Sequence, residues 1–185
     1  MKRREFCRNS LAAGAAAAYP FMINAAFAQS NIAAVSLDGA AIELEQAAVK
    51  GLAGRMEGTL LMQGDMQYDT SRKIWNGMWD KHPALIARCA SVEDVQQSVN
   101  FAAEHDLLVS VRGGGHSWPG KSVCDGGLMI DLADMHTVTA DPVKRRAYAQ
   151  GGALLNGLDL AALEHGLVTT AGVVSHPGVG GFTLG

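Results

Sequence analysis

Two glycine-rich segments in this 185-residue sequence have the composition of anion-binding loops. The first covers residues 113–120 and the second covers residues 178–185, and each follows a segment that we expect to be extended. Such loops present backbone N–H groups to an anion without side chains in the way. A dinucleotide pyrophosphate is the natural partner, because its charge is spread over two phosphates. The alternative interpretation is that both segments are tight turns without a ligand.

His116 is the residue of the first loop whose side chain could do chemistry. It follows the glycines at 113–115, where a histidine has little packing reason to occur. An imidazole nitrogen can act as ligand, base or nucleophile. A metal site would need further ligands, and none of the downstream histidines (His136, His165 and His176) has ligand spacing to His116. We therefore predict no metal.

Two common nucleotide-binding motifs fit the first loop only in part. Residues 115–122 match the P-loop pattern G-x-x-x-x-G-K-[ST], but residues 123–127 predict a turn into a strand where a P-loop would open a helix. The dinucleotide pattern G-x-G-x-x-G fits Gly113 and Gly115 but meets Trp118 at its third glycine. A P-loop nucleotide hydrolase is thus an alternative that the local context disfavours.

The elements expected before this loop form a strand–helix–strand unit. Residues 83–88 predict a buried strand and residues 107–111 predict a second strand. Between them, Ser91 can cap a helix. Its apolar stripe at helical spacing would consist of Val92, Val95, Val99 and Ala102. This order favours a βαβ unit with parallel strands.

Other segments have weaker patterns. Residues 40–53 predict a short helix, and residues 58–80 are expected to be irregular. The later part of the chain predicts a strand at 128–132, a hairpin at 136–140 and 145–150 around Asp141-Pro142, a helix at 153–165 that ends at Gly166, and an extended segment at 168–174.

Composition indicates a globular protein with a packed core. Hydrophobic residues make up 48% of the chain and charged residues 18%. The formal net charge of −3 gives no basic face for nucleic acid, so we predict no nucleic-acid partner. Cys89 and Cys124 form no C-x-x-C pair, and two buried free thiols are favoured over a disulfide.

Residues 1–28 have the order of an export signal, with a basic start, an apolar stretch and a small-x-small end at Ala26-Phe27-Ala28. Arg3-Arg4 is typical of a twin-arginine signal, and a general secretory signal is the alternative. Pro20 and Asn24 interrupt the apolar run, so we predict no stable membrane span. The protein is expected to be exported, either to the periplasm or as a secreted protein.

Four separated motifs resemble the PCMH-type FAD-binding domain of the vanillyl-alcohol oxidase superfamily, in its berberine-bridge-enzyme-like and oligosaccharide oxidase branch. In order, they are residues 111–117, 125–132, 151–153 and 178–185. Trp75-Asn76-Gly77 and residues 83–89 fit the usual lead-in of that family.

The resemblance implies an α+β, two-lobed FAD-binding domain over residues 68–185, preceded by a helical lead-in at 29–67. The first lobe would hold the small βαβ unit, and the second lobe would be truncated. The cofactor would be FAD, with its pyrophosphate bound between the lobes by backbone amides of the two loops. The implied FAD-binding residues are Arg112, Gly113, Gly114, Gly115, His116, Ser117, Gly120, Gly178, Val179, Gly180, Gly181, Thr183 and Leu184.

His116 would form a covalent 8α-histidyl bond to the flavin. One departure from the family pattern is His176-Pro177, which stands where members often have a threonine, and Pro177 removes an amide and a hydroxyl near the phosphates. Neither Cys89 nor Cys124 matches the position of a second, cysteinyl flavin link.

The resemblance further implies an FAD-dependent oxidase that acts on a small alcohol or carbohydrate substrate and reduces O₂. Family members continue well past Gly185, so the catalytic residues are unknown, and we expect this chain to be a fragment that is inactive alone. A different class of function is also open, namely an exported binding module that keeps the fold without flavin and without catalysis.

Overall fold

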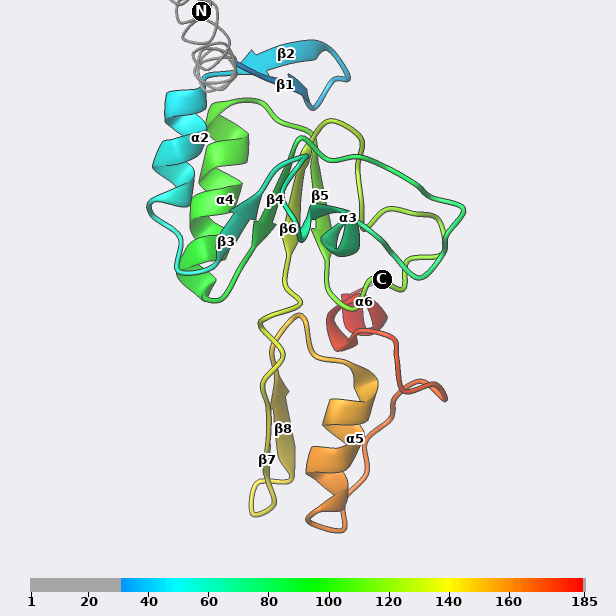
Figure 1. Ribbon diagram of the computed structural model, residues 1–185. Coiled ribbons are helices and arrows are strands. Elements are labelled where there is room, and N and C mark those ends of the chain that lie inside the picture. The colour runs from blue at the N-terminus through cyan, green and yellow to red at the C-terminus, as the bar shows by residue number, and fades with distance from the viewer. Residues whose placement is uncertain (1–30, 185) are drawn as a thin grey trace, which may run out of the picture.

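A four-stranded sheet forms the centre of the computed structural model, which describes residues 31–184 (Figure 1). Its strand order is β3-β4-β6-β5, and the strands are β3 (Thr59–Leu61), β4 (Leu85–Arg88), β5 (Val109–Arg112) and β6 (Leu128–Asp131). β3 is antiparallel to β4, while β4 and β5 each pair in parallel with β6. The predicted export signal at residues 1–28 lies outside the described residues.

Both faces of the two central strands, β4 and β6, are buried. Leu85, Ile86, Leu128 and Met129 are each 0% exposed, as expected for parallel strands covered on both sides. α2 (Gln46–Ala53) and α4 (Val92–Glu104) lie side by side over one face, and α3 (Tyr68–Ser71) lies over the other.

A second group of elements lies beyond the end of the sheet (Figure 1). The hairpin of β7 (Val138–Asp141) and β8 (Arg146–Ala149) packs against α5 (Leu155–Leu163), and the short α6 (Val179–Leu184) follows. Asp141 closes the hairpin turn by accepting the amides of Val143 and Lys144 at 3.1 and 3.0 Å. The predicted hairpin is thus confirmed as β7 and β8, and the helix predicted at 153–165 is confirmed as α5. Gly166 follows that helix with a φ of 64°.

The strand–helix–strand unit predicted from the sequence is confirmed as β4, α4 and β5. Its two strands are parallel, but they do not touch each other, because β6 lies between them. The chain therefore places its later strand in the middle of the sheet.

The N-terminal segment at 29–67 is less helical than predicted. β1 (Ile32–Val35) pairs antiparallel with β2 (Ala41–Leu44), so the first part of the helix expected at 40–53 is wrong, and only α2 is helical there. The hairpin forms because the turn at Ser36 is closed by its amide bonding to Ala40 O at 2.9 Å, and because Leu44 is buried in the core. Residues 58–80, expected to be irregular, likewise contain regular structure, namely β3 and α3. By contrast, residues 168–174, expected to be extended, form no strand.

The apolar stripe predicted for α4 is confirmed only for Ala102, which is buried, and for Val95, which packs against the core, whereas the predicted cap is confirmed. Val92 and Val99 are 57% and 50% exposed, whereas Asp94 and Ser98 are buried. The Asp94 carboxylate accepts the amides of Ala90, Glu57 and Gly58 at 2.8–2.9 Å, and the Ser91 hydroxyl accepts the Asp94 amide at 3.2 Å. Hydrogen bonds to the neighbouring loop therefore determine which side of the helix is buried.

Replacing Asp94 with asparagine is expected to lower the free energy of unfolding at neutral pH by about 1–3 kcal/mol, because an amide group cannot accept from all three donors. Burial raises the pKa of Asp94, but the three backbone hydrogen bonds outweigh burial and hold the pKa below its ordinary value. A lowered folded-state pKa contributes stability above the unfolded pKa of about 3.9, and this contribution is lost as the pH falls through the folded-state pKa.

The measurement is urea unfolding of wild type and Asp94→Asn between neutral pH and pH 3. The difference between the two should shrink as the pH falls below about 4. The exposed neighbour serves as the control, since Glu93→Gln should change little. A difference that stayed constant with pH would contradict the role assigned to the Asp94 carboxylate.

Cys89 and Cys124 are both buried free thiols, which confirms the favoured interpretation of their spacing. Burial raises the pKa of Cys89 to about 11 and also raises the pKa of Cys124. Both thiols are therefore poor nucleophiles in the folded chain.

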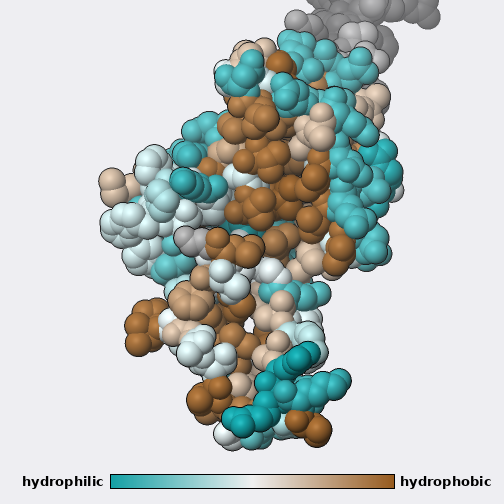
Figure 2. All heavy atoms as spheres, turned by 180° about the vertical axis from the view of Figure 1, so that it is seen from behind, coloured by the Kyte–Doolittle hydropathy of each residue, from teal (hydrophilic) through white to brown (hydrophobic). Residues whose placement is uncertain are grey.

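The surface of the sheet is not covered completely. β5 is an edge strand, and its Val109 and Val111 are 37% and 53% exposed. Figure 2 shows hydrophobic residues gathered in a band over the back of the upper part of the molecule. Within residues 31–184, no helix has both the length and the apolar character needed to cross a membrane.

Candidate functional site

The first glycine-rich loop begins where β5 ends, at the carboxyl edge of a parallel strand pair. The last residue of β5, Arg112, points its guanidinium at the fully buried Asp131 of β6, with contacts of 2.9 Å from Nε to Oδ1 and 3.1 Å from Nη2 to Oδ2. The remaining Nη1 donates to the carbonyls of Ser71 and Lys73. The Arg112 side chain therefore fixes the base of the loop to two neighbouring segments.

The backbone amides of residues 113–117 are free donors within the described chain. None of them donates a hydrogen bond to another residue of the segment 31–184. Gly115 is buried and has a φ of 67°, which lets the loop turn without a side chain. A row of consecutive free N–H groups is the feature that an anionic group could bind.

The glycine motifs meet one another backbone to backbone. A Cβ on Gly114 would lie 2.4 Å from the Gly178 nitrogen, and a Cβ on Gly178 would lie 2.3 Å from the Gly114 nitrogen. Gly113 and Gly180 approach the carbonyl of Gly151 in the same way, each with a Cβ distance of 2.8 Å. Three of the four sequence motifs thus converge, and these glycines are needed for close packing as well as for access to an anion.

The second glycine-rich segment is not the loop that the sequence predicts. From Val179 onward it is α6, because the Val179 amide bonds to Ala153 O at 2.8 Å and the Phe182 amide bonds to Gly178 O at 3.0 Å. The Thr183 hydroxyl donates to Val179 O at 2.8 Å, within the helix. The Pro177 carbonyl accepts the Leu155 amide at 3.0 Å, so this proline still holds the segment in place.

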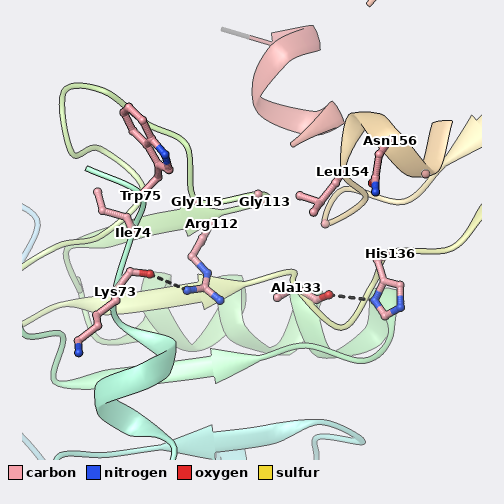
Figure 3. Close-up of a pocket in the computed structure, with 13 residues that line it drawn as sticks. Lys73, Ile74, Trp75, Arg112, Gly113, Gly115, Ala133, His136, Leu154 and Asn156 are labelled. Carbon is pink, nitrogen blue, oxygen red and sulfur yellow. Dashed lines mark hydrogen bonds between the residues drawn. The ribbon is translucent and has the colours of Figure 1, made fainter. Parts of the chain in front are cut away.

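Two cavities adjoin the first loop. One has a volume of 520 Å³ and brings together residues 113–117 with Gly178, Gly181 and Phe182. The other has a volume of 370 Å³ and lies between the sheet and the second group of elements. In Figure 3, Ile74 and Trp75 lie on one side of this second cavity, and Leu154, Asn156 and His136 lie on the other.

Not all of the predicted site residues line these two cavities. Val179, Gly180, Thr183 and Leu184 line a separate 470 Å³ cavity between β8, α5 and α6. Gly120 is buried with a φ of 69°, and a Cβ there would lie 2.4 Å from the Trp79 ring. The Ser117 hydroxyl accepts the Lys121 amide at 3.1 Å. Gly120 and Ser117 therefore shape the loop.

His116 stands at the rim of the 520 Å³ cavity with its ring stacked on Trp75. The ring centroids are 4.5 Å apart and the planes differ by 24°. No residue of the described chain makes a hydrogen bond to the His116 imidazole, so its ring nitrogens are available for chemistry. Among residues 31–184 there is no group of three or more potential metal ligands.

Several residues that hold the loop were not among the predicted site residues. The Asn76 side chain and the Trp79 indole N–H both donate to Trp118 O, at 2.8 and 2.9 Å. The Lys81 ammonium donates to the carbonyls of Gly120 and Val123 at 3.1 and 3.2 Å. The two tryptophans at residues 75 and 79 are the sequence feature from which these contacts to the loop could have been predicted.

The P-loop interpretation lacks its structural context. No helix follows Ser122; the chain turns at residues 123–127 and enters β6. The Lys121 side chain is exposed.

Residues 83–185 match the family model described as an FAD binding domain. The chain is similar to (R)-6-hydroxynicotine oxidase of Paenarthrobacter nicotinovorans, with 37% identity over 68% of this chain and 27% of that protein. Among solved structures it is similar to 6-hydroxy-D-nicotine oxidase from Arthrobacter nicotinovorans, with a TM-score of 0.65 and 35% identity over 66% of this chain and 27% of the other. It is also similar to the xylooligosaccharide oxidase of Myceliophthora thermophila, with a TM-score of 0.66 and 29% identity over 72% of this chain and 29% of the other. The chain thus spans less than a third of the length of each of these proteins.

Proposed function

Because this chain belongs to the FAD binding domain family of FAD-linked oxidases, we propose that it is the flavin-binding part of an exported oxidase that acts on an alcohol or carbohydrate and reduces O₂. The oligosaccharide oxidase among the similar structures supports this substrate class. The signal pattern at residues 1–28 supports export through a twin-arginine route to the periplasm or beyond.

The residues around the first loop fit FAD. Its pyrophosphate would be bound by the free amides of residues 113–117, beside Gly178 and Gly181 of the same cavity. The sheet with its helices and the hairpin with α5 would be the two lobes of the domain, and the first lobe would begin before residue 68, because β3 and α2 belong to it. Cavities of 370 and 520 Å³ on the two sides of the loop provide room for ring systems.

Bound FAD would supply the hydride-accepting chemistry of the oxidase. The protein's own contribution is to bind and orient. The amides at 113–117 offset phosphate charge, and Arg112 keeps their backbone in place through Asp131. No carboxylate lines the 520 Å³ cavity. We therefore propose that this chain alone, without further residues to supply a base, does not turn over substrate.

His116 is proposed to bind the flavin covalently, through one ring nitrogen and the 8α carbon. The bond would replace the imidazole N–H and one C–H of the flavin's 8α methyl group, and O₂ would take up the two protons and two electrons released as H₂O₂. The observation that carries the proposed function is the row of free amides at 113–117 next to an imidazole without a hydrogen-bond partner in the described chain.

The test is an absorbance spectrum after acid precipitation of the chain expressed with flavin available. Yellow colour should stay in the pellet of the wild type, and His116→Ala should release it to the supernatant. The matched control is His165→Ala, an exposed histidine at the end of α5, which should keep the colour. A chain that never takes up flavin would instead favour a non-catalytic binding module, and substrate-dependent peroxide from the purified chain would contradict its inactivity.

A further inference from the structure

The Trp75 side chain is 61% exposed, and its closest ring partner is His116. A large aromatic side chain left mostly in water loses much of the benefit of burial. Its near-parallel stack at 4.5 Å is in the range of favourable aromatic pairs. The contact therefore fixes the plane of the imidazole in a part of the loop that otherwise consists of small residues.

Trp75 also fixes the backbone next to His116. Its amide donates to the Gly115 carbonyl at 2.9 Å, and Gly115 is the buried residue with positive φ directly before the histidine. One residue thus contacts both the imidazole ring and the peptide that carries it.

Histidines that act on a ligand are usually oriented by a hydrogen bond from the second ring nitrogen to a carbonyl or carboxylate. In this chain His136 has such a bond, with Nδ1 3.0 Å from Ala133 O. His116 has none within the described residues, so the stack on Trp75 takes the place of that bond. Trp118 makes no ring stack with His116 in the described chain, and its own ring partner is Trp75, at 6.1 Å and tilted by 40°.

We propose that Trp75 is a positioning residue that holds the imidazole of His116 in the orientation needed for covalent attachment to the flavin; this inference rests on the proposed function. The reacting atoms are the imidazole nitrogen and the 8α carbon. A nitrogen–carbon bond would form, the imidazole N–H bond and one 8α C–H bond would break and each release a proton, and O₂ would take up these two protons and the two electrons of the C–H bond as H₂O₂. Trp75 gives and takes no atom or electron in this step.

The test compares Trp75→Ala with Trp75→Phe. The measured quantity is the rate at which added FAD stays with the protein pellet after acid precipitation. Both variants keep the backbone amide that bonds to Gly115, so only the ring differs. Loss of a stacking pair should slow attachment roughly two- to tenfold in Trp75→Ala, and Trp75→Phe should restore most of the rate. Total FAD uptake, measured before acid treatment, should be similar in all variants.

Trp118→Ala is the matched control, since it removes a tryptophan ring from the same cluster and keeps the carbonyl that Asn76 and Trp79 use. Its ratio of covalent to total FAD should equal that of the wild type. An equal loss in Trp118→Ala, or an unchanged rate in Trp75→Ala, would overturn the role of Trp75.

If FAD is not taken up at all, the proposed function fails. If FAD is bound and becomes covalent independently of the Trp75 ring, only the positioning role fails.

Discussion

Replacing Asp131 with alanine is expected to lower the free energy of unfolding by about 3–5 kcal/mol, because it leaves a buried arginine without its counter-charge. The Asp131 side chain is 0% exposed and accepts two hydrogen bonds from Arg112, whose own side chain is only 15% exposed. The Nε of Arg88 also lies 3.8 Å from this carboxylate and has no hydrogen bond of its own. Removing this carboxylate therefore leaves Arg112 without a counter-charge and leaves Arg88 paired only with Asp134. Equilibrium urea unfolding, followed by tryptophan fluorescence, measures the effect.

The control is Asp134, a neighbouring acid that also contacts Arg88 but lies at the surface. Asp134 bonds to Arg88 at 2.6 Å, but its side chain is 47% exposed. Asp134→Ala should therefore cost less than about 1 kcal/mol. If Asp131→Ala were as mild as Asp134→Ala, the buried ion pair could not be what anchors the loop.

The second large effect is expected at Gly114. A Cβ at this position would lie 2.4 and 2.6 Å from backbone atoms of Gly178, which cannot move aside as a side chain would. Gly114→Ala should destabilise the fold by about 1–3 kcal/mol and separate the two segments that line the 520 Å³ cavity. Flavin uptake should fall strongly in consequence. The measurements are FAD content after purification and the urea midpoint.

Gly77→Ala serves as the matched control, because Gly77 is exposed and a Cβ there meets no atom within 4 Å. It should leave both quantities unchanged. Gly178→Ala makes the same collision from the other side, with a distance of 2.3 Å, and should reproduce the loss. Normal flavin content in Gly114→Ala would show that the contact between these glycines does not shape the site.

Local sequence patterns correctly predicted the elements whose residues strongly favour one kind of secondary structure. β4 and β6 are short apolar runs, the hairpin has Asp141-Pro142 at its turn, and Ser91 caps α4 as expected. The position of β6 between β4 and β5 could not be read from the chain order, since pairing of strands distant in sequence depends on the whole sheet.

The errors have physical causes in tertiary contacts. The alanines before α2 favour a helix, but β2 forms there because it pairs with β1. In α4, periodicity predicted Val92 and Val99 on the buried side, but both are exposed, and Asp94 is buried because loop amides bond to it. In α6, the glycines were taken for a loop, although the segment is helical and its Gly180 packs against Gly151.

For the site, residue types identified His116 and the free backbone around it, and the family model agrees with the cofactor. The contact partners of these residues could not be predicted from the sequence. Nothing in the sequence linked Arg112 to Asp131, and the stack of Trp75 on His116 joins residues that are far apart in the chain. Such contacts appear only once the strands are in place.

The insertion of β6 between two earlier strands has a consequence for the order of folding. β4 and β5 have no hydrogen bonds to each other, so the parallel part of the sheet cannot close until residues 128–131 have reached the gap. The helix between β4 and β5 can form early from local contacts, but the sheet depends on pairings across about 20 to 40 residues, which are slow to find. Closure of the sheet by β6, and with it burial of Asp131 beside Arg112, is thus expected to be the late and cooperative step on which the glycine-rich loop depends.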